Sequence, residues 1–302
     1  MQKLLRKPIL SVLLAVAVGF ALIRPASAMA DPVPVTVSIV PQKYFVEKIG
    51  GSFVEVEVMV PPGATPEQYE PKPKQMAAVG KSRIYFACGV PFEKFWLERI
   101  ASSNPKMEIV HTDRFVEKRE MEAHSDAGHV HGAGAHEDGE AKDPHVWLSP
   151  PLVMLESRAV FEALAANDPQ NRGSYEDNYR KFISELADLD VSISHMFAGK
   201  TGSFMVFHPA WGYFADAYGL KQVPVEVEGK EPKARDLDNL IKRARELNVK
   251  SIFVQPQYSP KAAQTIADAV GAKLVYADDL APDWEKNLRQ VAEQIAAALG
   301  GK

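Results

Sequence analysis

Residues 168–199 of the chain, DPQNRGSYEDNYRKFISELADLDVSISHMFAG, carry a long and regular pattern of apolar side chains. The apolar positions recur at alternating steps of four and three, at Tyr175, Tyr179, Phe182, Leu186, Leu189, Ile193 and Met196. This spacing predicts one helix from Pro169 to about Phe197, opened by Asp168 and closed by Gly199. Such a helix is roughly 44 Å long, which exceeds a single small lobe. We interpret it as a stiff connecting helix; the alternative is a third-layer helix within one domain.

On both sides of this segment, short apolar strands alternate with helical stretches. Strands are predicted at 33–40, 53–60, 83–87, 108–110, 203–207, 222–225, 251–254 and 273–276. Helices are predicted at 41–49, 92–101, 150–166, 211–218, 236–247, 260–270 and 282–299. Uniformly apolar strands alternating with helices indicate parallel sheets covered on both faces.

The predicted fold class is therefore α/β, with two lobes joined by one long rigid helix. Each lobe contains a mostly parallel sheet flanked by helices. The predicted boundaries are 31–167 for the N-terminal lobe, 168–199 for the connecting helix and 200–302 for the C-terminal lobe.

The N-terminus has the features of a secretory signal peptide. Lys3, Arg6 and Lys7 precede an apolar run at residues 8–23, and the small residues of Ala26-Ser27-Ala28 follow. We predict cleavage at residue 28 or 30 and location in the periplasm. The alternative is a membrane anchor, but the apolar run is short for a hydrocarbon core of about 30 Å.

The charge balance of the chain argues against nucleic acid as a partner. The 302 residues include 35 Lys and Arg and 39 Asp and Glu, a net charge of −4. Without residues 1–28, 31 bases face 39 acids, which leaves −8. An acidic surface disfavours phosphate backbones and anionic membranes. The one cysteine, Cys88, excludes an internal disulfide and a multi-cysteine metal site, and we expect it to be a small buried filler.

Four of the eight histidines lie close together, between residues 124 and 136. They are His124, His129, His131 and His136, in a segment (124–142) otherwise composed mostly of Ala, Gly, Asp and Glu. This composition cannot build a core, so it predicts a loop within the N-terminal lobe. Imidazoles on an acidic loop suit weak, labile capture of Zn²⁺. The alternative is a linker whose histidines are incidental.

Four further polar residues stand where an open α/β sheet binds its ligands, at the carboxyl ends of strands. Glu67 follows the strand at 53–60 after a proline-rich turn, and His145 precedes the helix at 150–166. His208 ends the strand at 203–207, and Asp278 follows the strand at 273–276. Two imidazoles and two carboxylates, two from each half, suit a four-coordinate cation such as Zn²⁺, Mn²⁺ or Fe²⁺.

Several sequence blocks carry a family resemblance. They are Tyr69-Glu70-Pro71, DPHVWLSP at 143–150, FHPAWGYF at 207–214 and IFVQPQ at 252–257, together with the histidine-rich loop. In this order they resemble the zinc/manganese solute-binding proteins of ABC importers, of the zinc-uptake receptor type. The resemblance implies two α/β lobes bridged by a long helix, a metal between the lobes and delivery to a transmembrane permease.

One position departs from the family pattern. The family usually has histidine in a block like S-P-H-x-Y-E-P, whereas this chain has TPEQYEP at 65–71, with Glu67 at the histidine position. The resemblance places His145, His208 and Asp278 at the other three ligand positions. Direct ligation by Glu67 would give a harder site that tolerates Mn²⁺ or Fe²⁺. Alternatively, Glu67 stands aside and a loop histidine or water completes the shell.

The sequence thus predicts a monomeric periplasmic receptor that carries Zn²⁺ as cargo to an ABC importer permease and is not an enzyme. A manganese or iron receptor of the same architecture and a periplasmic zinc buffer are the alternatives. A zinc hydrolase is disfavoured because the chain lacks His-Glu-x-x-His, and a closed four-ligand site leaves little room for substrate.

Overall fold

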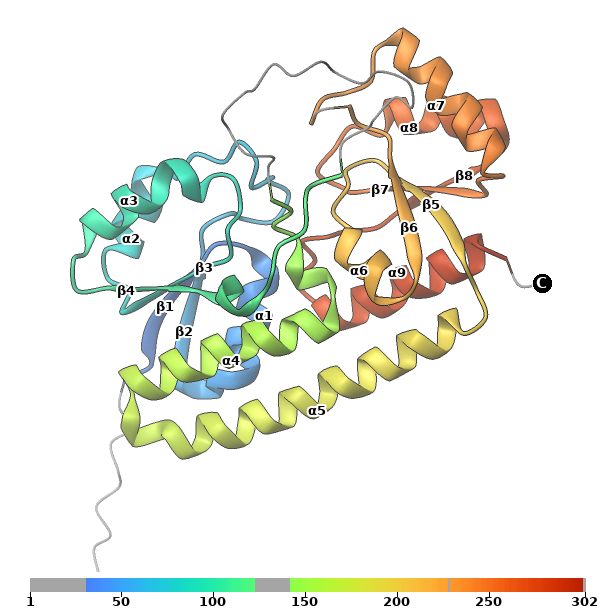
Figure 1. Cartoon of the computed structure of the whole chain (residues 1–302). Helices are drawn as coiled ribbons and strands as arrows, with labels where there is room; N and C mark the ends of the chain where they lie inside the picture. Colours follow the sequence, from blue (N-terminus) through green and yellow to red (C-terminus); the bar gives the residue numbers. More distant parts are fainter. Residues whose placement is uncertain (1–30, 123–141, 228, 301–302) are drawn as a thin grey trace, which may run out of the picture. The chain divides into compact units, whose positions relative to one another are not determined.

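Two four-stranded parallel sheets organise the chain (Figure 1). The computed structural model describes residues 31–122, 142–227 and 229–300, and from Pro32 onward the chain forms one compact unit. Strand order is β2-β1-β3-β4 in the first sheet and β6-β5-β7-β8 in the second, so both lobes have the same topology. The predicted α/β fold with two parallel sheets is confirmed.

The first lobe contains β1 (Val33–Val37), β2 (Val54–Val58), β3 (Ile84–Ala87) and β4 (Glu108–His111), with helices α1 (Val40–Gly50), α2 (Pro73–Val79), α3 (Glu93–Ser103) and α4 (Pro150–Asn167). The second contains β5 (Gly202–Val206), β6 (Leu220–Pro224), β7 (Ser251–Val254) and β8 (Lys273–Tyr276), with helices α6 (Gly212–Ala217), α7 (Ala234–Glu246), α8 (Lys261–Val270) and α9 (Trp284–Ala298). The sequence analysis missed α2, because its two-turn length gives too few apolar positions for a periodic signal.

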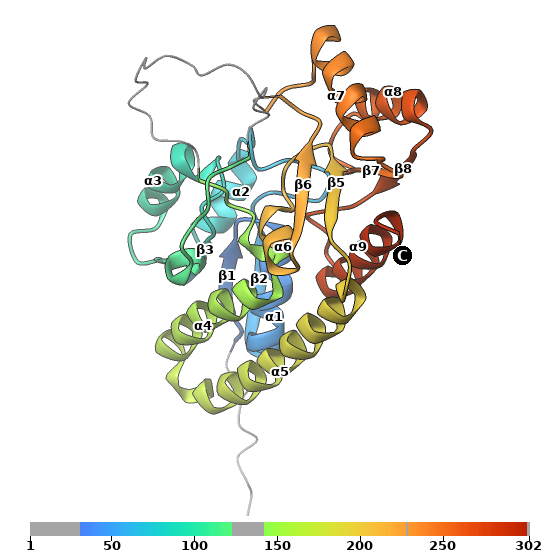
Figure 2. The same ribbon diagram turned by 45° about the vertical axis from the view of Figure 1, so that its right-hand side comes forward.

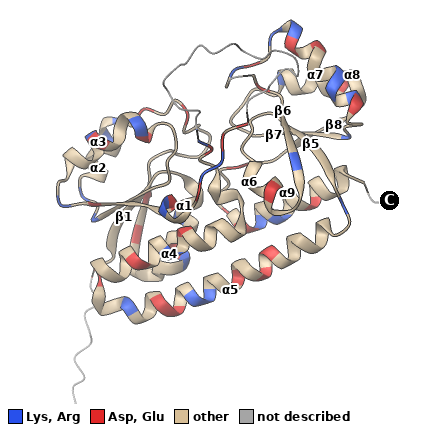
Figure 3. Cartoon of the chain, viewed as in Figure 1, with Lys and Arg blue, Asp and Glu red and all other residues tan. Residues whose placement is uncertain are grey.

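The predicted connecting helix is α5 (Arg172–Phe197), which has 26 residues and is therefore about 39 Å long. It begins three residues later than predicted, because Pro169–Asn171 forms a 3₁₀ turn. Its buried positions are Tyr175, Phe182, Leu186, Leu189, Ile193 and Phe197. The helix packs on α1 and α4 of the first lobe and on α9, and both views show it extending from one lobe to the other (Figures 1 and 2). Basic and acidic residues alternate over the first half of the helix, and the charged residues that follow are acidic (Figure 3).

The C-terminal helix α9 ties the two lobes together. Its first residue, Trp284, packs edge-on against Phe45 of α1, with the ring centroids 5.1 Å apart. The Trp284 indole N–H donates to the carbonyl of Trp147 at 2.8 Å, and the Trp147 indole N–H donates to the carbonyl of Asp279 at 2.7 Å. These two hydrogen bonds fix the segment after β8 against the segment before α4.

Within the described residues, no helix is both long and apolar enough to cross a membrane. The predicted signal peptide, residues 1–28, lies outside the described residues.

A fully buried carboxyl group stabilises the first lobe only when it is protonated. Glu156 on α4 is hydrogen-bonded through Oε1 to Thr112 Oγ1 at 2.9 Å, and its Oε2 has no partner. Burial raises the pKa of Glu156 to about 8, partly offset by the Thr112 hydrogen bond. The folded protein therefore holds Glu156 neutral at pH 7.

Because the folded-state pKa lies above the unfolded value, Glu156 costs stability as pH rises from about 4.5 to 8. We expect Glu156→Gln to remove this cost. Relative to wild type, the free energy of unfolding of this variant should improve by roughly 3 to 4 kcal/mol between pH 5 and pH 8. Urea denaturation at several pH values measures this, and a difference that does not change with pH would contradict it.

Candidate metal centre

Three of the four predicted ligands come together between the lobes. Among the described residues, Glu67, His145 and His208 form a group in which one ligand atom from each lies within 4.8 Å of the others. Glu67 lies in the loop after β2, His145 precedes a 3₁₀ turn (Val146–Leu148) before α4, and His208 follows β5. Both histidines are buried, and Glu67 is partly exposed.

His208 is held at the centre of the second sheet. The strands β5 and β7 are neighbours in the sheet, and Gln255 directly follows β7. The His208 backbone N–H donates to Gln255 Oε1 at 3.2 Å, and Gln255 Nε2 donates to the His208 carbonyl at 2.8 Å. Strands β6 and β7 leave β5 on opposite sides, so His208 lies at a topological switch point, where such sheets bind ligands.

A carboxylate orients each imidazole. His145 Nδ1 lies 2.7 Å from Asp143 Oδ1, and His208 Nδ1 lies 2.9 Å from Glu226 Oε1. These partners assign the Nδ1–H tautomer to both rings and turn both Nε2 atoms toward each other. Sequence reasoning missed both carboxylates: Asp143 stood in the DPHVWLSP block without a role, and Glu226 follows β6 with no local motif.

The spacing of the inward-facing atoms fits a tetrahedral ion. The two Nε2 atoms are 3.3 Å apart, and Glu67 Oε1 is 3.6 Å from His208 Nε2. A tetrahedral zinc with Zn–N bonds of 2.0–2.1 Å has ligand-to-ligand edges of about 3.3 Å. These two distances are close to such an edge, and the ligand atoms of Glu67 and His145 lie within 4.8 Å of each other.

The fourth predicted ligand, Asp278, is not in this group. Its Oδ1 accepts hydrogen bonds from Gln257 Nε2 at 2.8 Å and from the Leu280 backbone N–H at 3.0 Å. The next residue, Asp279, is buried, and its Oδ1 has no hydrogen-bond partner. Burial raises the pKa of Asp279 to about 6, although the nearby His145 and His208 rings lower it. Asp279 also lies outside the group of three, but unlike Asp278 it is buried, has a free carboxylate oxygen and is close enough to both imidazoles for their charges to lower its pKa.

Aromatic rings enclose the imidazole pair. Tyr258 stacks on His208 with centroids 5.1 Å apart and an interplanar angle of 17°. On the other side, the Trp147 ring lies 5.0 Å from the His145 ring. These rings exclude water and lower the local dielectric constant, which strengthens electrostatic interactions inside the site.

His208 carries a proton at neutral pH when no metal competes for it. Burial lowers the pKa of His208, but the Glu226 hydrogen bond and the charges of Glu226, Glu67 and Asp279 outweigh burial and raise it to about 8. Two Nε2 lone pairs facing each other at 3.3 Å repel unless a proton or a cation lies between them. A metal ion therefore takes the place of this proton.

The remaining histidines and the cysteine are not part of this group. His111 and His195 are exposed, and Cys88 is fully buried, as expected for a filler. The predicted capture residues His124, His129, His131 and His136 lie outside the described residues.

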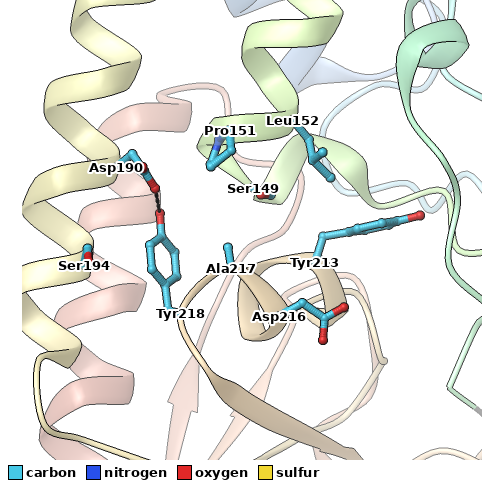
Figure 4. A pocket seen from close by; sticks show the side chains of 9 residues that line it. All are labelled: Ser149, Pro151, Leu152, Asp190, Ser194, Tyr213, Asp216, Ala217 and Tyr218. Atoms are coloured by element: carbon cyan, nitrogen blue, oxygen red, sulfur yellow. Dashed lines mark hydrogen bonds between the residues drawn. The ribbon is translucent and has the colours of Figure 1, made fainter.

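A surface pocket of about 430 Å³ lies where α4, α5 and α6 meet (Figure 4). Tyr218 Oη donates to Asp190 Oδ1 at 3.0 Å on one side of it, and Tyr213 extends from α6 away from α5. Its lining residues include none of the three grouped ligands, so it is separate from the metal centre.

Two α/β lobes, each built on a parallel sheet, with a buried histidine–carboxylate site between them are typical of a metal-binding solute receptor. Comparison with known proteins gives the family. A family model described as ZnuA, zinc-uptake complex component A, periplasmic, matches residues 35–298. The chain belongs to this family of periplasmic zinc-uptake binding proteins, which are transport receptors and not enzymes.

Individual relatives agree with the family model. The high-affinity zinc uptake system protein ZnuA of Bacillus subtilis (strain 168) is 32% identical over 252 residues, covering 82% of this chain and 78% of the relative. A crystal structure of ZnuA has 40% identity and a TM-score of 0.83, over 89% of this chain and 100% of that one. A ZnuA deletion mutant with zinc bound has 39% identity and a TM-score of 0.81, over 90% and 100%.

The raised pKa of His208 predicts how zinc binding depends on pH. Since zinc must displace the His208 proton, affinity should fall about tenfold per pH unit below pH 8 and level off above it. Calorimetric titration in buffers of different ionisation enthalpy should show about one proton released at pH 7. Binding that is independent of pH between 6 and 8 would contradict this assignment.

Proposed function

We propose that this protein binds one Zn²⁺ through Glu67, His145, His208 and Asp279 and delivers it to an ABC importer permease. The observation that carries the proposal is the pair of Nε2 atoms 3.3 Å apart, each ring oriented by a carboxylate. Both partners, the metal and the permease, follow from membership of a zinc-uptake complex family.

For the fourth ligand, the sequence and the geometry indicate two different residues that are adjacent in the chain. The family resemblance favours Asp278, whose carboxylate is already engaged by Gln257 and Leu280. Burial, an unpartnered Oδ1 and the charges of both imidazoles favour Asp279. We therefore propose Asp279 as the ligand and Asp278 as the residue that shapes its turn.

Direct ligation by Glu67 follows from the same reasoning. Its Oε1 lies near His208 Nε2, and its Oε2 is buried without a hydrogen-bond partner. A buried carboxylate oxygen without a partner is costly unless a cation or water satisfies it. A zinc ion bound by the two imidazoles would satisfy it.

Export and assembly extend the proposal beyond the described residues. The family is periplasmic, and the predicted signal peptide at 1–28 supports export with cleavage at residue 28 or 30. All four proposed ligands belong to one chain, which supports a monomer. We further propose that the histidines between 124 and 136 capture zinc, so that deletion of this segment should slow zinc binding when zinc is scarce.

Metal selectivity decides between zinc and the alternative manganese or iron receptor. Two imidazoles with two carboxylates suit several divalent ions, and the Irving–Williams order favours Zn²⁺ over Fe²⁺ and Mn²⁺ at such a site. The mature protein, purified without a tag or chelator, should contain one zinc per chain and keep it against both competitors. Preferential retention of manganese or iron, lost in Glu67→Ala, would overturn the zinc assignment.

A matched pair of variants tests the fourth ligand. Asp279→Asn should weaken zinc binding by at least about tenfold, because it removes a negatively charged ligand from a buried site. Asp278→Asn changes the neighbouring carboxylate in the same way and should alter the affinity by less than about threefold. Competition with a fluorescent zinc chelator measures both; the reverse order of effects would assign the ligand to Asp278.

A further inference from the structure

One arginine contributes to the attachment of the chain segment before His145 to the second lobe. Arg119 lies in the segment after β4, and its backbone N–H donates to Tyr213 Oη of α6 at 3.0 Å. The Arg119 carbonyl accepts the backbone N–H of Asp143 at 2.9 Å. Tyr213 Oη in turn donates to the Asp143 carbonyl at 2.9 Å. These three bonds close a ring between Arg119, Asp143 and α6.

The guanidinium of Arg119 reaches into the same junction. Its Nη2 pairs with Glu122 Oε1 at 2.6 Å, and its Nε lies 3.4 Å from Asp216 Oδ2 on α6. The Arg119 side chain is 22% exposed, and its Nη1 is buried without a hydrogen-bond partner. Tyr213 and Asp216 project from α6 on the side away from α5 (Figure 4).

Nη1 of Arg119 and a carboxylate oxygen of Asp143 share one small space. Asp143 uses Oδ1 to hold the His145 ring, whereas its Oδ2 is fully buried without a partner. Both atoms lie against Gly212, the first residue of α6. A Cβ on Gly212 would collide with Arg119 Nη1 and lie 3.0 Å from Asp143 Oδ2. The guanidinium of Arg119 and the buried carboxylate of Asp143 are thus neighbours, and the missing side chain of Gly212 leaves room for both.

We propose that Arg119 is a positioning residue that sets zinc affinity by clamping Asp143, and through it His145, against the helix that follows His208. Gly212 is four residues beyond His208, so the clamp joins the chain segment that carries His145 to the one that carries His208. This inference rests on the proposed zinc-binding function.

Charge balance gives the clamp its physical reason. Four carboxylates, those of Glu67, Asp143, Glu226 and Asp279, surround two imidazoles. A single Zn²⁺ compensates only half of this negative charge. A buried carboxylate without compensation is unfavourable, and the Arg119 guanidinium supplies a fixed positive charge beside Asp143. Fixing Asp143 in turn fixes the ring orientation of His145.

Competition binding of Zn²⁺ to the full mature protein tests the clamp. Arg119→Gln should weaken zinc binding by about 10- to 100-fold, the usual effect of losing a group that orients a ligand. Arg119→Lys keeps the positive charge but not the planar guanidinium, and it should weaken zinc binding by a smaller factor. Arg114→Gln is the charge-matched control: Arg114 pairs with Glu162 on the surface at 2.7 Å, and its loss should leave affinity within about twofold.

Two further measurements separate positioning from general stability. Arg119→Gln should have little additional effect in an Asp143→Asn background, since both changes break the same link. Gly212→Ala should displace the guanidinium while Arg119 remains, and reproduce the loss without unfolding the protein. The visible absorption bands of the Co²⁺-loaded protein should change in Arg119→Gln and not in Arg114→Gln.

Zinc affinity within twofold of wild type in both Arg119→Gln and Gly212→Ala would overturn the clamp. An undiminished effect of Arg119→Gln in the Asp143→Asn background would also overturn it. A wild-type protein that binds no zinc tightly would instead overturn the proposed function.

Discussion

Two imidazole nitrogens that face each other at 3.3 Å in a buried site set the conditions for the rest of this structure. Each ring donates its Nδ1 proton to a carboxylate, so each presents a lone pair to the other. This arrangement is unfavourable unless a proton or a metal ion lies between the nitrogens. The carboxylates that orient and surround the rings raise the pKa of His208, so a proton occupies this position when no metal is bound.

The fold produces this geometry by holding two lobes of similar topology in a fixed arrangement. Both sheets have the same strand order, and His208 projects from the switch point of the second. Helix α5 spans both lobes. The indole N–H groups of Trp147 and Trp284 donate hydrogen bonds that hold the segment before α4 against the segment after β8. A connection of this kind favours small adjustments over wide hinge closure, which suits a site whose ligands are already close together.

The sequence predicted the fold and the histidines because each rests on a local signal. The alternating steps of four and three gave α5, and strand ends gave His145 and His208. The groups that orient the rings gave no such signal, because Glu226 and Asp143 meet the imidazoles only after the chain has folded. Whether Asp278 or Asp279 points into the site depends on where β8 ends. Sequence patterns do not define the end of a strand to within one residue.

The coordination shell of the zinc-loaded protein tests this account most directly, and X-ray absorption spectroscopy at the zinc edge measures it. The account predicts four nitrogen or oxygen neighbours at about 2.0–2.1 Å, of which two are imidazoles. Three or more imidazoles would contradict it, because among the described residues His145 and His208 are the histidines of this site. Such a result would mean that a histidine from another part of the chain, such as those between residues 124 and 136, is a zinc ligand in place of a carboxylate.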